Sequence, residues 1–227
     1  MTERGLQVSD HYRGAAGAHY VEMRQRDQSH VGYALDFDYF RPFLQATDLV
    51  LDFGCGNGGM LRLMAPHVRR VEGIEVNPSA AQIARASGLT IYSSLDELPD
   101  GTAYDVVVSN HVLEHVRDVP STLEGLRSRI RRRGLILLKL PMEDWRAADS
   151  KRWSSDDVDH HLQTWTPKLI GNVMYESGFE VQDIRIVTSA WHPKLFPLVR
   201  VGLGPIAFWA LSVAKKRRQL FVIGTVS

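Results

Sequence analysis

An apolar segment that runs into a glycine-rich turn constrains the fold of this chain more than any other feature. The segment is Val50-Leu51-Asp52-Phe53, and it is followed by Gly54-Cys55-Gly56-Asn57-Gly58-Gly59. Apolar residues before glycines predict a buried parallel strand that enters a tight loop. Glycine adopts positive φ angles and lets a ligand approach the backbone without hindrance from a Cβ atom. After the first strand of an α/β sheet, such a loop is where a nucleotide-like cofactor binds.

The glycine spacing alone fits two kinds of cofactor site. Gly54, Gly56 and Gly59 match the G-x-G-x-x-G pattern that places a pyrophosphate at a helix N-terminus. Gly54, Gly56 and Gly58 instead match G-x-G-x-G. Asp52 favours the second pattern, because a carboxylate before the loop would repel a pyrophosphate but would attract a cationic amino group.

A second motif lies downstream, in Tyr104-Asp105-Val106-Val107-Val108-Ser109-Asn110-His111-Val112-Leu113-Glu114-His115-Val116. It resembles the fourth-strand motif of class I S-adenosylmethionine-dependent methyltransferases, which also use the G-x-G-x-G loop. With Glu75 between the two motifs, the chain resembles this family, in its small-molecule type, from about Asp36 to the C-terminus. The resemblance implies an α/β fold with a doubly wound, mostly parallel seven-stranded sheet, helices on both faces and an antiparallel last strand.

Strand and helix patterns alternate along the chain, as a parallel sheet requires. We predict strands at 49–53, 71–76, 89–92, 105–109, 135–140, 179–187 and 219–226. Asn77-Pro78 and Thr166-Pro167 are typical helix starts, with Gly88 and Gly178 as the matching ends. Ser121 and Glu124 form a capping-box pattern that predicts a helix to about residue 132, ending in a run of arginines.

Length and composition favour one globular domain over residues 1–227. The formal net charge of +1 gives no reason to expect a nucleic-acid partner. The single cysteine, Cys55, cannot form an intrachain disulfide, and residues 1–17 lack the apolar core of a secretory signal. We therefore expect a cytoplasmic protein, with residues 1–35 as an N-terminal cap, 142–165 as an acceptor loop and 189–218 as an apolar insertion.

Several residues are candidates for holding the cofactor. Glu75 ends the second strand, where an acid accepts hydrogen bonds from the ribose hydroxyls. The resemblance implies S-adenosylmethionine as cofactor, with Val76 against the adenine and Ser94 where the family often has an acid. The expected binding residues are Asp52, Gly54, Cys55, Gly56, Glu75, Val76, Ser94 and Asn110. From the N-terminal segment, Tyr20 and Arg24 are expected to cover the methionine carboxylate, and Tyr12 precedes them.

Histidines are the candidates for a catalytic base, because an oxygen acceptor must lose a proton and imidazole titrates near neutral pH. His111 follows the fourth strand at the edge where the methyl group should point. His115 and Glu114 are expected to shape the following loop. His160 and His161 lie in an acidic, tryptophan-containing loop with Trp145 and Trp153. We expect no metal there, because metal ligands must converge on one point and a contiguous run seldom does.

Residues 195–213 are mostly apolar but are interrupted by Pro197, Arg200 and Pro205, and four cations follow at 215–218. A lid on the acceptor site or a homodimer face are the first interpretations of the 189–218 insertion. Peripheral contact of 195–218 with the inner face of an anionic membrane is the next, and a membrane span is the last.

The sequence therefore predicts a methyltransferase that acts on a small molecule or on a glycan or lipid precursor, with oxygen as the preferred acceptor atom. One alternative is an NAD(P)-dependent oxidoreductase or epimerase, which Asp52 and the 110–116 motif disfavour. Another is a non-catalytic protein that binds the cofactor without turnover.

Overall fold

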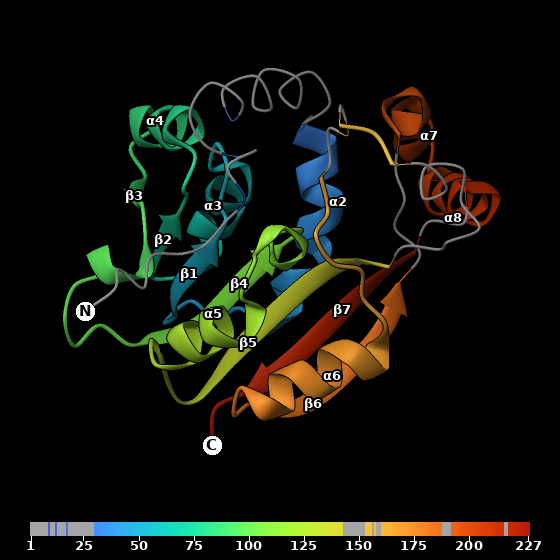
Figure 1. Cartoon of the computed structure of the whole chain (residues 1–227). Helices are drawn as coiled ribbons and strands as arrows, with labels where there is room; N and C mark the ends of the chain where they lie inside the picture. Colours follow the sequence, from blue (N-terminus) through green and yellow to red (C-terminus); the bar gives the residue numbers. More distant parts are fainter. Residues whose placement is uncertain are drawn as a thin grey trace.

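The fold is known from a computed structural model that describes residues 9, 12, 17, 30–142, 153–155, 157, 160–187, 192–215 and 218–227. Within these residues, one seven-stranded sheet has the order β3-β2-β1-β4-β5-β7-β6 (Figure 1). The strands are β1 (Leu49–Phe53), β2 (Arg70–Ile74), β3 (Thr90–Tyr92), β4 (Tyr104–Asn110), β5 (Ile130–Met142), β6 (Glu180–Val187) and β7 (Arg218–Thr225). β7 pairs antiparallel with β5 and β6, whereas the first five strands pair in parallel. The predicted α/β sheet with an antiparallel last strand is confirmed.

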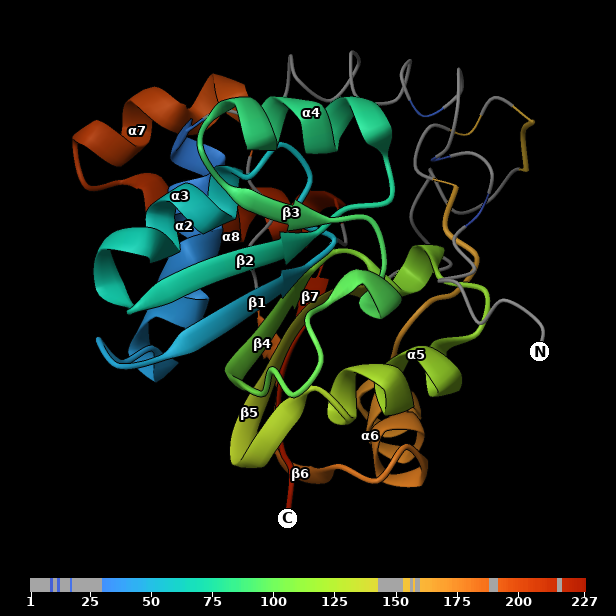
Figure 2. The same ribbon diagram turned by 90° about the vertical axis from the view of Figure 1, so that its left-hand side faces the viewer.

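Helices cover both faces of the sheet. The helices are α2 (His30–Phe40), α3 (Gly59–Met64), α4 (Pro78–Ala86), α5 (Val119–Arg127), α6 (Pro167–Glu176), α7 (Phe196–Arg200) and α8 (Gly204–Lys215). Short 3-10 turns are η2 (Arg41–Phe43), η3 (Ala65–His67), η4 (Leu95–Glu97), η5 (Leu113–His115) and η7 (Pro193–Leu195). Figure 2 shows α2 and α3 on one face, with α5 and α6 on the other.

Two apolar cores follow from this layering. Strand residues alternate between the faces, so Leu51 packs with the α5 and α6 core and Val50 with the α2, α3 and α4 core. All five residues of β1 are buried, as expected of a strand covered on both faces. The sheet therefore brings the carboxyl ends of β1, β2, β4 and β5 to one buried edge, where ligands bind in folds of this kind.

Helix α5 differs from its prediction. Its N-cap is Asp118, whose side chain accepts a hydrogen bond from the Ser121 backbone N–H, so the helix begins at Val119. It ends at Arg127, and Arg131 to Arg133 belong to β5 instead. The predicted arginine-rich helix end is therefore wrong. These arginines extend the strand because Ile130 pairs with Tyr104 before the main β4–β5 register begins.

The predicted 189–218 insertion contributes η7, α7 and α8 between β6 and β7. The apolar pattern at 206–213 falls within α8. No helix among the described residues is both long enough and apolar enough to cross a membrane.

Candidate functional site

The glycine loop leaves β1 with its backbone tied to β2. The N–H groups of Gly54 and Cys55 both donate to the carbonyl of Ile74, at 2.8 and 3.0 Å. Gly54 has φ +79°, and a Cβ atom there would lie 2.3 Å from Val112. Gly56 has φ +55°, but nothing lies within 4 Å of where its Cβ would be. The loop is thus packed at Gly54 and open at Gly56, which gives a ligand access to bare backbone.

Two carboxyl groups flank this loop, the buried Asp52 and the half-buried Glu75. Oε2 of Glu75 accepts a hydrogen bond from the Gly56 N–H at 2.8 Å, and Oε1 accepts from the Asn77 N–H at 2.7 Å. Burial raises the pKa of Glu75. Burial and the nearby charge of Glu75 together raise the pKa of Asp52 to about 8. This part of the site is therefore short of positive charge, and a bound cation would relieve the repulsion between the two carboxylates.

The other predicted cofactor residues line the same edge. Cys55 is buried, and burial raises the pKa of its thiol, so the thiol is neutral. Val76 is half-buried against the α5 and α6 core, and Ser94 is half-buried at the start of η4. Asn77 caps α4 by accepting from the N–H groups of Ser79 and Ala80. The carboxyl ends of β2 and β3 are therefore followed by the polar residues Asn77 and Ser94 and by the apolar Val76.

Asn110 and Lys139 extend the edge onto β4 and β5, where they are register partners. Nζ of Lys139 lies 2.5 Å from Oδ1 of Asp36 on α2, and the Asn110 amide donates to the other Asp36 oxygen at 3.1 Å. Burial opposes ionisation of Asp36, but the charge and hydrogen bond of Lys139, together with His111 and Asn110, outweigh it and hold the pKa of Asp36 below its ordinary value. Asn110 Oδ1 is buried and has no hydrogen-bond partner among the described residues.

A buried carboxylate surrounded by imidazoles lies next to this ion pair. His111 has φ +57°, and its side chain is 31% exposed. Nδ1 of His111 lies 3.3 Å from Oε1 of Glu114, and Nε2 of His115 lies 3.9 Å from the same oxygen. Burial alone would raise the pKa of Glu114, but the neighbouring imidazoles outweigh it and lower this pKa. Neither Glu114 oxygen has a partner with hydrogen-bond geometry within the described part of the chain.

Tyr12 and the 160–163 segment both pack on this group. The Tyr12 hydroxyl lies 2.7 Å from Nδ1 of His115, and burial lowers the pKa of His115 to about 4. The ring of His161 lies 5.0 Å from that of His115, and the Leu162 N–H donates to the Glu114 carbonyl at 2.8 Å. Glu114, His115 and His161 offer ligand atoms within 4.8 Å of one another, which is close enough to hold a metal ion. The structure therefore brings His111, His115 and His161 around Glu114, and His160 directly precedes His161 in the same segment.

Comparison with known proteins identifies this architecture. A family model described as a methyltransferase domain matches residues 25–184. The chain belongs to the methyltransferase domain family. An uncharacterized methyltransferase of Schizosaccharomyces pombe is 32% identical over 102 residues, which are 40% of this chain and 39% of the relative. A ubiquinone biosynthesis O-methyltransferase of Rhizobium leguminosarum is 27% identical over 150 residues, which are 59% and 60% of the two chains. The chain thus matches less than two thirds of the length of these curated relatives.

Solved structures give the same fold. A chain in the complex between the Haloferax volcanii Trm112 methyltransferase activator and a methyltransferase aligns with a TM-score of 0.63 and 20% identity, covering 96% of both chains. An S-adenosylmethionine-dependent methyltransferase of Mesorhizobium loti aligns with a TM-score of 0.60 and 16% identity, covering 80% of this chain and 92% of the other. At these identities the likeness shows a shared methyltransferase fold.

Some predicted residues of this methyltransferase lie outside the described residues: Tyr20, Arg24 and Trp145. Their expected roles stay predictions. His160 is described and has φ +43°. Trp153 is described too, with 89% of its surface exposed, so it packs little against the described core.

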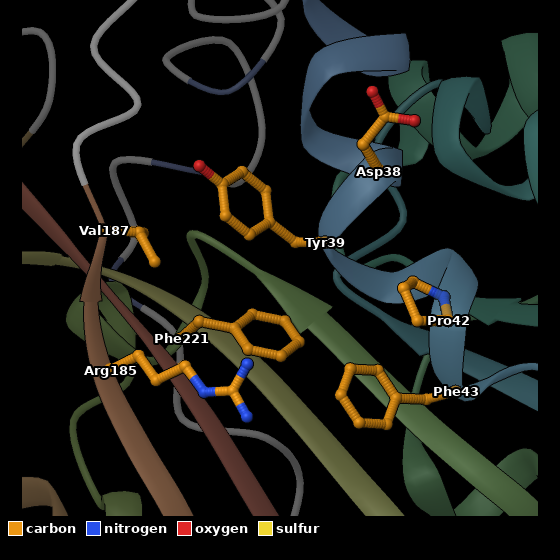
Figure 3. Close-up of a pocket in the computed structure, with 7 residues that line it drawn as sticks. All are labelled: Asp38, Tyr39, Pro42, Phe43, Arg185, Val187 and Phe221. Carbon is orange, nitrogen blue, oxygen red and sulfur yellow. The ribbon is translucent and has the colours of Figure 1, made fainter. Parts of the chain in front are cut away.

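A hollow of about 230 Å³ lies on the α2 face of the methyltransferase sheet, beyond the Asp36–Lys139 pair. The rings of Tyr39, Phe43 and Phe221 surround it, and the Arg185 guanidinium lies beside Phe221 (Figure 3). Register pairing puts Asn110, Lys139, Phe221 and Arg185 in one row across β4, β5, β7 and β6. The hollow is therefore separated from the glycine loop by the strands that carry Asn110 and Lys139.

Sequence reasoning missed the roles of Asp36 and Lys139 in this methyltransferase. The signal was present, since Lys139 interrupts an otherwise apolar strand, and a lysine in a buried strand needs a partner. Its partner lies 103 residues away on α2, a separation that no local pattern spans.

Proposed function

We propose that this methyltransferase binds S-adenosylmethionine at the Gly54–Gly56 loop and methylates an oxygen atom of a small molecule or of a lipid- or glycan-linked precursor. The observation that carries the proposal is the open backbone at Gly56 between the buried Asp52 and the half-buried Glu75. A nucleoside with a cationic amino acid arm fits this combination, because it can approach the bare backbone and its positive charge favours the ionised form of Asp52.

Each part of the cofactor has a proposed partner. Asp52 stands near the cationic amino group, and Glu75 receives the ribose hydroxyls with the lone pairs that its two backbone bonds leave free. Val76 packs on the adenine, with Ser94 near its amino group. Cys55 and Asn110 border the methionine arm, and Tyr20 and Arg24 cover its carboxylate. S-adenosylhomocysteine or S-adenosylmethionine is bound in two Haemonchus contortus phosphoethanolamine N-methyltransferase 2 structures of similar fold, which supports this choice of cofactor.

His111 is the proposed base. When bound, the cofactor supplies an activated methyl group, so the protein must orient the acceptor and remove its hydroxyl proton. Glu114 faces Nδ1 of His111, which leaves Nε2 for the acceptor proton. A buried anion beside the ring stabilises the imidazolium that forms. His160 and His161 remain candidate acceptor contacts through their segment's packing on η5.

Oxygen is the proposed acceptor atom for two reasons. A histidine paired with a buried carboxylate suits a hydroxyl, which must lose a proton, better than a neutral amine, which mainly needs orientation. Several curated relatives are named ubiquinone biosynthesis O-methyltransferases, at 25% to 31% identity. We further propose that the protein works in the cytoplasm without a nucleic-acid partner.

Incubation with methyl-labelled cofactor and a metabolite extract tests the proposal. A labelled product that carries an O-methyl group would support it, and a labelled amine or carbon acid would correct the acceptor atom. A rise in melting temperature with NAD but none with S-adenosylmethionine would favour the oxidoreductase alternative. Cofactor binding without label transfer from extracts of several cell types would favour the non-catalytic alternative.

A further inference from the structure

Helix α8 turns apolar residues toward solvent. Its buried positions are Gly204, Phe208 and Ser212, four residues apart. The exposed positions of α8 are Pro205, Ile206, Trp209, Ala210, Val213, Ala214 and the final Lys215. Ile206, Trp209 and Val213 are 67%, 57% and 54% exposed. A helix on the surface of a soluble protein normally carries charged residues on that side, and residues 201–214 contain none.

The turn before α8 continues this surface. Val201 is 67% exposed and Leu203 is 50% exposed. Together with Ile206, Trp209 and Val213 they form what we call the α8 face. Figure 1 shows α7 and α8 at one corner of the molecule, beside the ends of β6 and β7 and away from α5. Ile206, Trp209 and Val213 follow the spacing of one side of a helix, and exposed apolar residues gathered in this way mark an interaction site.

The charges that flank the α8 face along the chain have one sign. After Asp183 the chain contains no acidic residue and seven cations, Arg185, Lys194, Arg200, Lys215, Lys216, Arg217 and Arg218. Of these, Arg185, Lys194, Arg200, Lys215 and Arg218 are exposed in the structure. Arg200 ends α7 and Lys215 ends α8, so cations border the apolar residues on both sides along the chain.

We propose that the α8 face docks this protein on a bilayer that contains anionic lipids. Exposed aliphatic side chains enter the boundary between headgroups and acyl chains, an interfacial tryptophan suits the same depth, and the flanking cations attract the lipid phosphates. The 12 residues of α8 span roughly 18 Å, against roughly 30 Å of hydrocarbon, so the helix lies on the membrane without crossing it.

The charge pattern favours lipid over a second copy of the chain. A two-fold contact between two α8 faces would bring the same surface of each copy together, and therefore Arg200 and Lys215 of one copy near those of the other. Such like charges repel, whereas anionic headgroups neutralise them. The inference goes beyond the proposed function and does not depend on it, because membrane binding is measured without cofactor or acceptor.

Vesicle flotation of the full chain tests the inference. The vesicles are phosphatidylcholine alone or phosphatidylcholine with phosphatidylserine, at low and high salt. The Ile206→Ser/Trp209→Ser variant removes apolar contact, and Leu169→Ser/Tyr175→Ser on α6 is its matched control, since both are also exposed. The Arg200→Glu/Lys215→Glu variant reverses charge, and Arg132→Glu/Lys168→Glu is its control at exposed positions of β5 and α6.

We expect the wild-type chain to float with the anionic vesicles at low salt and to bind at least about tenfold more weakly at high salt or to neutral vesicles. Both α8-face variants should lose at least about tenfold in affinity, and both controls should keep it. Absence of wild-type binding, or equal binding by an α8-face variant, would overturn the inference. A chain that is dimeric in light scattering, and that the Ile206→Ser/Trp209→Ser variant makes monomeric, would also overturn it.

Discussion

The ammonium group of Lys139 on β5 lies 2.5 Å from a carboxylate oxygen of Asp36 on α2, and neither side chain is more than 10% exposed. This pair fastens α2 over the carboxyl edge of β4 and β5, beside the proposed base. Lys139 also lies over the Tyr39 ring, 5.3 Å from its centroid. The edge that we propose for the acceptor is therefore stiffened by a charge pair that takes no part in the proposed chemistry.

Lys139→Met should destabilise the fold by about 3–5 kcal/mol, because it leaves the Asp36 carboxylate buried without its partner. The double variant Asp36→Asn/Lys139→Met should recover most of this loss, since no buried charge remains. Urea unfolding measures both, and Lys168→Met on the exposed side of α6 should stay within about 0.5 kcal/mol of the wild type. A Lys139→Met variant as stable as the wild type would show that the Asp36–Lys139 pair contributes nothing to the free energy of unfolding.

Asp52 should make the stability of the unliganded chain depend on pH. Its pKa is raised to about 8 by burial and by Glu75. A group whose pKa is higher in the folded state gives its full stability below the unfolded pKa and loses it as the pH rises through the folded pKa. Stability should therefore fall between about pH 4 and pH 8, by at most about 1.4 kcal/mol per pH unit from this group.

Asp52→Asn should remove that fall, so urea unfolding at pH 8 should find the unliganded variant more stable than the wild type. The same variant should bind S-adenosylmethionine at least about tenfold more weakly, because it lacks the anion for the amino group. A variant that loses stability at pH 8, or that keeps wild-type affinity, contradicts this account of Asp52.

Gly56→Ala should fold but lose the cofactor. Both Gly56 and Gly101 have positive φ, and nothing lies within 4 Å of the point where a Cβ atom would stand at either residue. Alanine at either place should therefore cost a similar strain of about 1–2 kcal/mol. Only the methyl group at Gly56 enters the proposed cofactor space, so titration should find S-adenosylhomocysteine affinity reduced more than about tenfold there and unchanged in Gly101→Ala. Equal affinities would place the cofactor elsewhere.

His111→Ala should reduce label transfer by about 10²–10⁴-fold while S-adenosylhomocysteine affinity changes little, because a base acts on the acceptor proton. Glu114→Gln should keep part of the activity and move the pH profile of label transfer, because His111 would lose the carboxylate oxygen that lies 3.3 Å from its Nδ1. A moved pH profile would indicate that Glu114 positions His111, because a purely structural role would lower the activity equally at every pH. Turnover at the wild-type level in His111→Ala would exclude His111 as the base.

Dialysis against a chelator should leave label transfer unchanged, since the proposed chemistry uses no metal ion. Glu114, His115 and His161 are close enough to ligate a metal ion. The experiment therefore tests whether these three side chains bind a metal that the reaction needs. Activity that falls with the chelator and returns with added zinc or magnesium would show instead that these side chains act as ligands.

Sequence predicted the sheet because its determinants are local. Val50 to Phe53 form an apolar strand before obligatory glycines, and the bounds of β1 match the prediction. Asn77 and Thr166 cap their helices as expected, since a cap needs only a side-chain oxygen and the next turn. The helix α5 was placed wrongly because Asp118 and Ser121 both have cap chemistry, and only tertiary pairing of Ile130 with Tyr104 fixes where the helix must end.

The site was only partly predictable. The positions of Asp52, Gly56 and Glu75 follow from strand ends, which converge in any parallel sheet. Tyr12 packs on His115 across 103 residues, and burial lowers the pKa of His115. Such long-range contacts decide which of several histidines is buried and which, like His111, stays partly exposed.

Isothermal titration of S-adenosylhomocysteine into the wild-type chain tests the central claim most directly. The account predicts saturable heat with one ligand per chain, and no comparable heat from NAD. No heat from S-adenosylhomocysteine or S-adenosylmethionine, together with a clean NAD titration, would contradict it.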